Sequence, residues 1–416
     1  MTTTSPHTHP PLDARRWPDV ARVPGGRLRA AVARALVRHA TARSGVRVRT
    51  GSTAPAADDG APVLELRDPD AFHRRLAAGG LIGFGESYMA GEWDSPDLVA
   101  LLTRLAADYD NLVPRPLQPL RHVTLPRRPA SDRNTRAGSR RHISHHYDLS
   151  NDLFGLFLDR TMTYSSALFE DGEARDRDTL PRAQERKTDR LLDAAGVAEG
   201  VELLEIGTGW GELAVRAARR GARVTTVTLS AEQRDLAVER VAAAGLSDRV
   251  DVRLCDYRDV TGTYDAVVSV EMIEAVGERY WPVYFAALER LVRPGGRVGL
   301  QSITMEHAMM RASRGSYTWM HKYVFPGGLI PSVTAVEERL RAGTSLRVTD
   351  RFSFGRDYAD TLRVWRENFT DAADRVEALG FDATFRRMWS FYLAYCEAGF
   401  LSGIIDVEQI TMEKAR

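Results

Sequence analysis

A glycine-rich run, EIGTGWG over residues 205–211, stands where a buried strand is expected to turn into a helix. Gly207, Gly209 and Gly211 would let a ligand approach the backbone N–H groups at the helix N-terminus. Glu205 precedes the loop, where its carboxylate could orient the amino group of a cationic ligand. A tight strand–helix turn without a ligand is the alternative interpretation.

The same run argues against a nicotinamide cofactor. A dinucleotide fingerprint requires G-x-G-x-x-G and an acidic residue at the end of the second strand. Position 212 is Glu212, and the second strand ends in TLS at residues 228–230. Hydride transfer is therefore disfavoured.

The elements around this loop predict a doubly wound α/β fold. Short apolar segments alternate with amphipathic helices from about residue 180 onward, which is typical of a buried parallel sheet. A further strand, two helices (356–369 and 383–401) and a last strand (404–412) should complete a mixed sheet. The five expected buried strands cover residues 201–207, 223–230, 250–256, 264–271 and 297–303.

A long connection follows the fifth strand. Residues 305–332 are rich in Met, aromatic residues and Gly, and connections of this length usually carry function. We expect a cap near 305–345, and about a third of its large apolar residues and those of the last helix to line an apolar pocket. These residues are Met305, Met309, Met310, Tyr317, Trp319, Tyr323, Phe325, Trp389, Phe391, Tyr392 and Tyr395.

Charge is distributed unevenly along the 416 residues. Residues 1–150 hold 22 Lys and Arg against 15 Asp and Glu, whereas the remainder holds 35 against 41. We expect a basic N-terminal domain over 1–115 with 1–25 unstructured, an Arg- and Pro-rich linker over 116–141, and a catalytic domain over 142–416. A basic first domain favours an anionic partner surface.

Within the first domain, residues 26–43 predict a helix, and residues 63–110 predict a strand, a helix, a glycine-containing turn over 79–97 and a second helix. Leu28, Ala31, Val32, Ala35 and Leu36 recur at helical spacing in the first of these. Two interpretations stay open: a basic surface helix packed on its domain, or a helix lying on anionic lipid.

Several classes are disfavoured by composition. No run approaches the roughly 20 apolar residues of a membrane span, and the first residues lack the apolar core of a secretory signal, so a cytoplasmic protein is expected. Cys255 and Cys396 are too few for a disulfide framework or a Cys-based metal site and are expected to be core thiols.

Six motifs match a known family in order and spacing. The runs EIGTGWGELA, TLSAEQ, CDYRDV and SVEMIEAVG are preceded by HHYDLSNDLFGLFLDRTMTYSSALFEDGE and, further upstream, by GFGESYMAGEWDSPDL. Together they resemble the cyclopropane-fatty-acyl-phospholipid synthases, which include the mycolic acid methyltransferases. The resemblance implies a seven-stranded, Rossmann-like class I methyltransferase domain with a smaller, mainly helical N-terminal domain, and S-adenosyl-L-methionine as cofactor.

The resemblance also implies how that cofactor is held. Gly207 and Gly209 would contact its amino acid part, Thr228 and Gln233 its ribose, and Asp256 or its neighbours the adenine. Tyr164 and Ser165 would close over the sulfonium, a cation that an aromatic face can stabilise. The expected cofactor-binding set also contains Glu205, Gly211 and Val270, and no metal site is expected.

At the reacting end, the resembling enzymes use a bound bicarbonate as the base. Of the residues that hold it, Glu274, Ile303 and Tyr358 match here. Ser166 stands where the family has Cys, and Gln301 stands where it has His. Both replacements can hydrogen-bond an anion, but Gln cannot carry a positive charge as His can.

A third departure is Glu271, where the family usually has Gly. This adds a carboxylate close to Glu274, and two close acids favour protonation of one of them or replacement of the bicarbonate.

These three departures surround the group that removes a proton. After methyl transfer to a double bond, the resulting cation gives a cyclopropane if a methyl proton leaves with ring closure, and an exocyclic methylene if a hydride shift comes first. The sequence therefore favours a methylene-forming enzyme similar to those that begin tuberculostearic (10-methyl) acid synthesis, with a cyclopropane synthase as the alternative.

The expected partners follow from that chemistry. They are a phospholipid with an unsaturated acyl chain, the anionic inner face of the membrane and a separate reductase for a methylene product. The resemblance also implies a homodimer. No nucleic acid partner is expected, because no RNA-binding module accompanies the arginines. Methylation of a small molecule or of RNA remains a distant alternative.

Overall fold

The computed structural model describes residues 12–51, 60–109, 112 and 150–416. The chain divides into two compact units. The first comprises Met1–Arg127, Tyr317–Lys322 and Phe369–Ser402, and the second comprises Arg128–Ser316, Tyr323–Asn368 and Gly403–Arg416. The expected linker over 116–141 lies outside the described residues.

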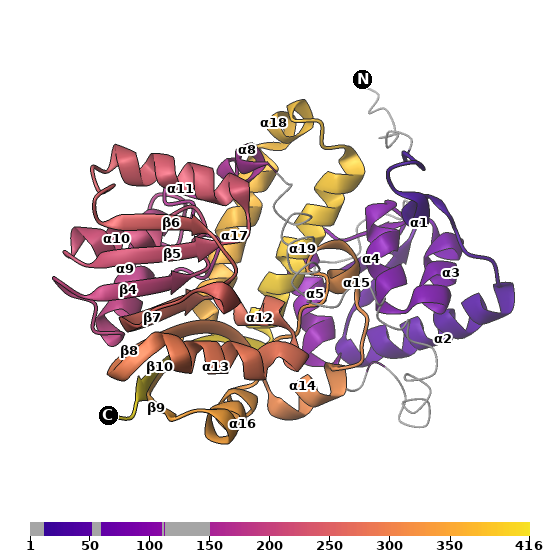
Figure 1. Cartoon of the computed structure of the whole chain (residues 1–416). Coiled ribbons are helices and arrows are strands. Elements are labelled where there is room, and N and C mark those ends of the chain that lie inside the picture. The colour runs from indigo at the N-terminus through magenta and orange to yellow at the C-terminus, as the bar shows by residue number, and fades with distance from the viewer. Residues whose placement is uncertain (1–11, 52–59, 110–111, 113–149) are drawn as a thin grey trace. The chain divides into compact units, whose positions relative to one another are not determined.

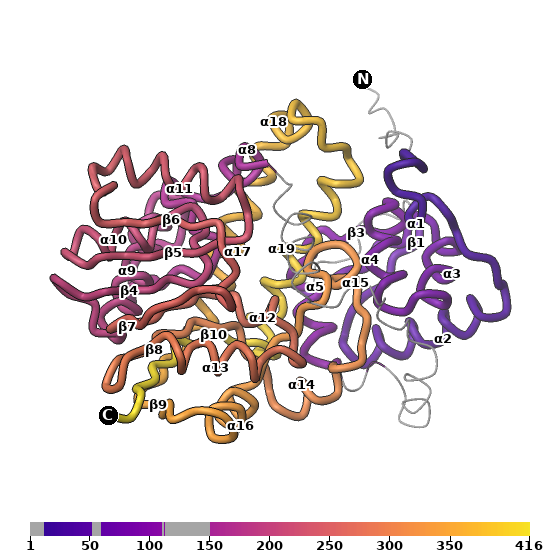
Figure 2. The backbone as a smooth tube through the Cα atoms, viewed as in Figure 1, coloured from indigo at the N-terminus to yellow at the C-terminus, as the bar shows by residue number. Residues whose placement is uncertain are grey.

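The second unit is built on a seven-stranded sheet of order β6-β5-β4-β7-β8-β10-β9 (Figures 1 and 2). Strands β4 to β8 are parallel, and β10 runs antiparallel to both β8 and β9. This confirms the predicted doubly wound mixed sheet. The strands are β4 (Glu202–Ile206), β5 (Arg223–Thr228), β6 (Val250–Leu254), β7 (Tyr264–Val270), β8 (Val292–Met305), β9 (Leu346–Ser353) and β10 (Ile405–Lys414).

Both faces of this sheet are covered by helices. Successive residues of a strand point to opposite faces, so Leu203 belongs to the core that contains residues of α9 and α10, whereas Leu204 belongs to the core that contains residues of α13 and α16. Burial on both faces explains why the central strands are apolar throughout. The helices of this unit are α8 (Asn151–Gly155), α9 (Leu180–Ala194), α10 (Glu212–Arg219), α11 (Ala231–Ala243), α12 (Ile273–Val276), α13 (Trp281–Leu291), α14 (His307–Ser313), α16 (Val333–Gly343) and most of α17 (Gly355–Asp371), with 3-10 turns η4 (Tyr257–Asp259) and η5 (Glu278–Tyr280).

The first unit is mainly helical with a small three-stranded sheet of order β1-β2-β3. Phe391 of its last helix packs among Phe84, Tyr88, Trp93 and Trp319, which form the aromatic core of this unit. Its elements are α1 (Pro18–Ala21), α2 (Arg27–Ser44), β1 (Arg47–Thr50), β2 (Val63–Leu66), α3 (Pro69–Gly79), α4 (Leu81–Met89), β3 (Trp93–Asp94), α5 (Leu98–Ala107), α15 (Trp319–Tyr323, up to Lys322), α18 (Ala373–Ala378) and α19 (Ala383–Leu401).

Three features of the first unit differ from the sequence-based expectation. The predicted turn over 79–97 contains helix α4, because its glycines serve close packing. A Cβ on Gly83 would lie 2.0 Å from the carbonyl oxygen of Arg75, and one on Gly85 would lie 2.4 Å from the ring of Trp319. Helix α1 falls within the stretch 1–25 that was expected to be unstructured. Residues 317–322 and 369–402, expected in the catalytic domain, group with the first unit.

Helix α2 has the predicted extent but buries the opposite side. Ala30, Ala33 and Val37 are buried, whereas Leu28 and Val32 are 88% and 59% exposed. The stripe read from the sequence as the packing face therefore lies at the surface. No helix in the described part of the chain is long and apolar enough to cross a membrane.

Candidate active site

The glycine loop joins β4 to α10 in the second unit. Gly207, Gly209 and Gly211 have φ angles of 99°, 51° and 91°, in the left-handed region that favours glycine. A Cβ on Gly211 would lie 3.1 Å from the Cβ of Ala237, whereas one on Gly209 would meet nothing within 4 Å. Gly211 is thus required for helix packing, and Gly209 leaves open space for a ligand.

Glu205 is the second-last residue of β4, two positions before Gly207 of that loop. Its side chain is buried and accepts a 2.7 Å hydrogen bond from Thr226 Oγ1. Burial raises the pKa of its carboxyl to about 8. A cationic amino group bound here would favour the ionised carboxylate, which suits the amino acid part of S-adenosylmethionine.

The residues expected near the ribose and adenine lie at the ends of β5 and β6. Thr228 Oγ1 donates to Gln233 Oε1 at 2.8 Å, which fixes both side chains at the start of α11. Asp256 begins turn η4 and binds Arg258 through both carboxylate oxygens, at 2.8 and 2.5 Å. Val270 ends β7, beside β4 in the sheet.

The segment that carries Tyr164 and Ser165 is held from several sides. The Tyr164 ring contacts Phe154 edge-on and Trp365, with centroids 5.1 and 5.4 Å apart. Lys187 of α9, which is fully buried, donates to Ser165 Oγ at 2.7 Å. Burial lowers the pKa of Lys187 to about 8, and the carboxylates around it oppose that shift.

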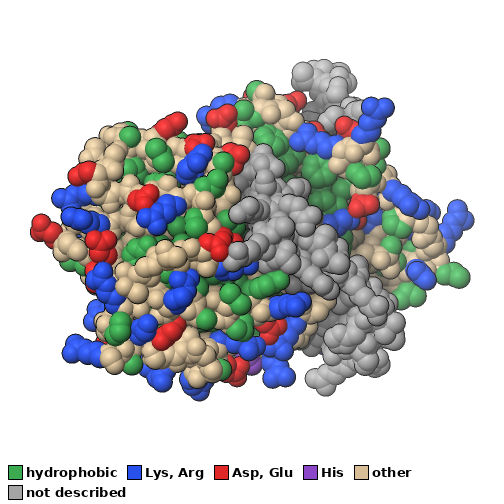
Figure 3. Space-filling view, viewed as in Figure 1, with side chains coloured by type: hydrophobic (Ala, Val, Ile, Leu, Met, Phe, Trp, Pro, Cys, Tyr) green, Lys and Arg blue, Asp and Glu red, His purple; other side chains and the backbone are tan. Residues whose placement is uncertain are grey.

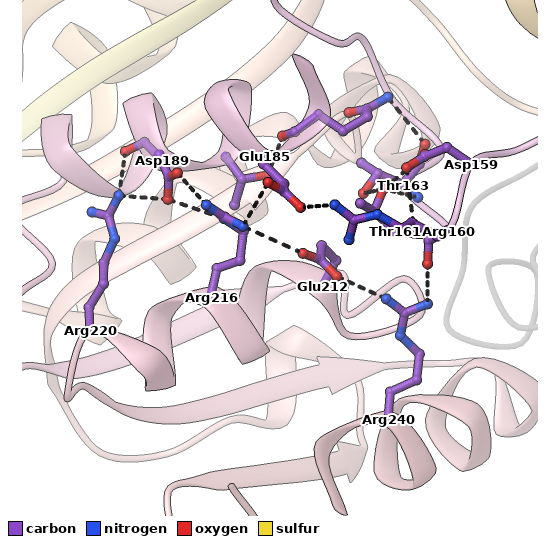
Figure 4. Close-up of polar contacts among 12 residues, drawn as sticks. Asp159, Arg160, Thr161, Thr163, Glu185, Asp189, Glu212, Arg216, Arg220 and Arg240 are labelled. Atoms are coloured by element: carbon purple, nitrogen blue, oxygen red, sulfur yellow. Dashed lines mark hydrogen bonds and ion pairs between the residues drawn. The ribbon is translucent and has the colours of Figure 1, made fainter. Parts of the chain in front are cut away.

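An ion-pair network fixes the start of the same segment (Figure 4). Arg240 of α11 donates to Glu212 at 2.8 Å and to the carbonyl oxygen of Arg160 at 3.2 Å. Arg160 in turn pairs with Glu185 of α9 at 2.6 Å. Because Glu212 is the first residue of α10, this network ties the segment to the helix that the glycine loop introduces.

Glu271 is the centre of the reacting end. It follows β7 with φ of 48°, a conformation that only glycine adopts without strain. Its Oε1 accepts from the backbone N–H of Ser166 at 3.0 Å and from Gln301 Nε2 at 2.8 Å, and its Oε2 accepts from Tyr358 O–H at 2.6 Å. Strain at a residue held by so many partners indicates a functional constraint.

Glu274 lies one helical turn further on, at the start of α12. Its Oε1 accepts from Ser302 Oγ at 2.9 Å and from the backbone N–H of Ile303 at 2.5 Å. Among the described residues, its buried Oε2 has no hydrogen-bond partner. An unsatisfied buried oxygen is costly unless the carboxyl group is neutral or a ligand meets it.

The two carboxyl groups differ in their preference for a proton. Burial and the charge of Glu271 raise the pKa of Glu274 to about 8. Burial also raises the pKa of Glu271, but Tyr358, Lys187, Ser166 and Gln301 all oppose this shift. Glu274 is therefore the member of the pair that more readily keeps a proton, whereas the donors around Glu271 favour its carboxylate form.

The structure brings together all six residues expected at the reacting end, and it adds three that sequence reasoning missed. Lys187 lies on an amphipathic helix and resembled an ordinary solvated cation. Ser302 lies between the predicted residues Gln301 and Ile303 on β8, so the sequence already placed it close to Glu274. Gln409 of β10 donates to Gln301 Oε1 at 3.1 Å, and only the strand pairing reveals it.

The expected apolar lining residues are divided between the units. Met305, Met309, Met310, Tyr323 and Phe325 belong to the second unit. The first unit contains Tyr317, Trp319, Trp389, Phe391, Tyr392 and Tyr395. Of these, Phe391 and Trp319 contact each other through their rings, so both have a packing role in that unit. The described residues hold no cluster of three or more His, Cys, Asp or Glu that could bind a metal ion.

A sheet of this order, with a glycine loop after its first parallel strand and a buried glutamate below it, defines a class I S-adenosylmethionine-dependent methyltransferase. The chain belongs to the mycolic acid cyclopropane synthetase family, whose model matches residues 134–410.

Two curated relatives cover most of the chain. It is 55% identical to tuberculostearic acid methyltransferase UfaA1 of Mycobacterium tuberculosis (strain ATCC 25618 / H37Rv), over 96% of both chains. It is 34% identical to the cyclopropane-fatty-acyl-phospholipid synthase of Escherichia coli (strain K12), over 84% of this chain and 87% of that protein. Among solved structures, mycolic acid cyclopropane synthase CmaA1 complexed with SAH and CTAB is 31% identical, with a TM-score of 0.60, over 66% of this chain and 98% of that one.

Proposed function

We propose that this methyltransferase transfers a methyl group to the double bond of an unsaturated fatty acyl chain carried by a phospholipid and releases a methylene-branched chain. The observation that supports it most directly is the Glu271 carboxylate held by Tyr358, Ser166 and Gln301. The 55% identity with a tuberculostearic acid methyltransferase over nearly the whole chain supports the substrate class.

The chain's own residues would prepare this reaction in two ways. S-adenosylmethionine, when bound, supplies an electrophilic methyl group. Glu205 and the glycine loop would hold its amino acid part, and Thr228 and Gln233 its ribose. Tyr164 presents an aromatic ring near the sulfonium end without a nucleophile that could intercept the methyl group.

Glu271 takes the role that the resemblance assigns to bicarbonate. Tyr358 has one O–H and Ser166 has one backbone N–H, and both protons are already donated to Glu271. The donor set therefore does not fit a further anion, and two neighbouring carboxyl groups would disfavour one. A carboxylate oxygen of Glu271 accepts the proton that leaves the transferred methyl carbon.

This arrangement favours the methylene product. The three donors offset part of the rise in pKa that burial gives Glu271, so proton removal is slower than it would be with an unpaired buried carboxylate, and the hydride shift that moves the cation to the neighbouring carbon can come first. The proton then leaves the methyl carbon, and its C–H electron pair forms the exocyclic double bond. A separate reductase would be needed to convert this methylene group to a methyl branch.

The proposal is tested by expressing the chain in a bacterium that lacks its own cyclopropane synthase and is supplied with oleate. Fatty acid methyl esters are analysed by gas chromatography and mass spectrometry, and NMR distinguishes the two products of equal mass. We expect an exocyclic methylene, and none from Glu274→Gln. A cyclopropane ring would retain the family and exclude the proposed product, and unmodified acyl chains would exclude the lipid substrate.

We further propose that the protein binds the anionic inner face of the membrane through helix α2. Its exposed apolar residues Leu28 and Val32 are flanked on both sides by arginines, and the helix contains no acidic residue. Figure 3 shows Lys and Arg side chains next to hydrophobic ones on the visible face. Such a helix can insert its apolar stripe between lipid headgroups while its arginines pair with phosphates.

Leu28→Ser combined with Val32→Ser should weaken binding to phosphatidylglycerol-containing vesicles by about 30-fold, since each lost side chain removes about 1 kcal/mol of insertion energy and about 1.4 kcal/mol corresponds to tenfold. Sedimentation with vesicles measures this. The matched control is Val238→Ser on α11, which is 45% exposed. Thermal stability should not change in either variant. Equal vesicle binding by the double variant and the wild type would contradict a role for α2.

A further inference from the structure

A chain of hydrogen bonds connects the surface of the second unit to Glu271. Arg190 of α9 donates to Gln409 Oε1 at 2.8 Å, Gln409 Nε2 donates to Gln301 Oε1 at 3.1 Å, and Gln301 Nε2 donates to Glu271 Oε1 at 2.8 Å. Both glutamines are fully buried, whereas the Arg190 side chain is 27% exposed.

Arg190, at the surface end of this chain, determines which group donates and which accepts in every hydrogen bond of the chain. A guanidinium only donates, so the oxygen of the Gln409 amide must face Arg190. Its NH₂ group then faces two acceptors, the carbonyl oxygen of Lys187 at 3.0 Å and Gln301 Oε1. Gln301 is thereby left with its own NH₂ group towards Glu271, and reversing either amide would place oxygen against oxygen.

We infer that Gln409 and Arg190 are positioning residues that keep Gln301 oriented as a hydrogen-bond donor to Glu271. This inference rests on the proposed function of Glu271 as the base. An amide does not relay protons readily, so the chain is an orienting device. It places the positive end of the Gln301 dipole on Glu271 Oε1 and thereby favours the carboxylate over the protonated acid.

Strand pairing and surface packing both stabilise the chain. Gln301 and Gln409 are direct partners across the antiparallel pair β8–β10, so their side chains lie on the same face of the sheet. Arg190 is held by the ring of Phe352, 3.8 Å from its centroid, and by Asp350 at 3.4 Å. Its guanidinium therefore stays beside Gln409.

Other charged groups around Glu271 define what the pH dependence should contain. Lys187 on α9 and Tyr358 on α17 favour the carboxylate form of Glu271, and Glu274 on α12 is the neighbouring acid whose own pKa the Glu271 charge raises. Without the oriented amide, Glu271 loses one of these favourable contacts and keeps the others. The acid limb of the pH profile for kcat should then move to higher pH, while the affinity for S-adenosylmethionine stays unchanged.

The test compares Gln409→Met and Arg190→Gln with the wild type in pH profiles of kcat and in cofactor affinity by calorimetry. We expect Gln409→Met to raise the acid-limb pKa by about one unit, which lowers kcat about tenfold at pH values below that limb. Arg190→Gln should shift that pKa in the same direction by less, and Arg190→Lys should restore the wild-type profile because Lys also donates to Gln409 Oε1.

Asp350→Asn is the matched control, because it removes a surface charge next to Arg190 while the Phe352 ring and Gln409 still hold the guanidinium; its profile should equal that of the wild type. If Gln409→Met does not fold, the pH profile of Arg190→Gln tests the inference instead, because the Arg190 side chain is only half-buried. Unchanged pH profiles in folded variants would overturn the inference even if Glu271→Gln is inactive. Full activity of Glu271→Gln would instead overturn the proposed base.

Discussion

Glu271→Gln should lower turnover by about 10²–10⁴-fold, the range expected for loss of a general base. The amide cannot accept the proton, and its NH₂ group would replace one of the two oxygens that now accept hydrogen bonds from Ser166, Gln301 and Tyr358. The measurement is the initial rate of product formation on oleoyl phospholipid, with S-adenosylmethionine affinity determined in parallel. That affinity should change little, because none of the residues expected to bind the cofactor donates to Glu271.

The pH profile gives this prediction a second readout. Glu271 acts as a carboxylate, and burial raises its pKa from the ordinary value, so the rate should fall as pH decreases through that raised pKa. Glu278→Gln is a suitable control, since Glu278 pairs with Arg314 away from the base. Retained turnover in Glu271→Gln that depends on added bicarbonate would show that a bound anion is the base.

The sequence predicted the sheet well because its physical causes are local. Leu203 and Leu204 point to opposite faces and are both buried, so β4 reads as an uninterrupted apolar strand. The structural role of glycine residues was harder to predict from the sequence. Gly83 and Gly85 resembled turn residues, yet they lie in helix α4, where the closeness of Arg75 and Trp319 requires them. The partners that distinguish these cases are distant in sequence.

The site was predictable to the extent that strand ends define it. Glu271 directly follows β7, and Gln301 of the neighbouring parallel strand β8 pairs with Val270, the last residue of β7, which places both at one edge of the sheet. Gln409 was not predictable in the same way, because its contact with Gln301 depends on the register of an antiparallel strand 108 residues later. For α2 the spacing located the apolar stripe correctly, but the prediction that this stripe is the buried side was wrong. Which side of a helix is buried depends on what packs against it.

Glu271→Gly combined with Gln301→His and Ser166→Cys should redirect the product from an exocyclic methylene to a cyclopropane. Glycine removes the strain of a φ near 48°, about 1–2 kcal/mol, and releases the Tyr358 O–H and the backbone N–H of residue 166. The imidazole can carry the positive charge that Gln301 cannot. Together these changes restore the donor set that the resemblance assigns to bicarbonate, so activity should depend on added bicarbonate.

NMR of the methyl esters separates the two outcomes, because cyclopropane ring protons and vinylidene protons resonate far apart. Glu271→Gly alone is the informative control: it removes the internal base, keeps the amide at 301, and should regain part of its turnover when bicarbonate or formate is added. A triple variant that still forms only the methylene would place product control outside these residues. The cofactor loop is unchanged in every variant, so a change of product at constant cofactor affinity would arise from the base alone.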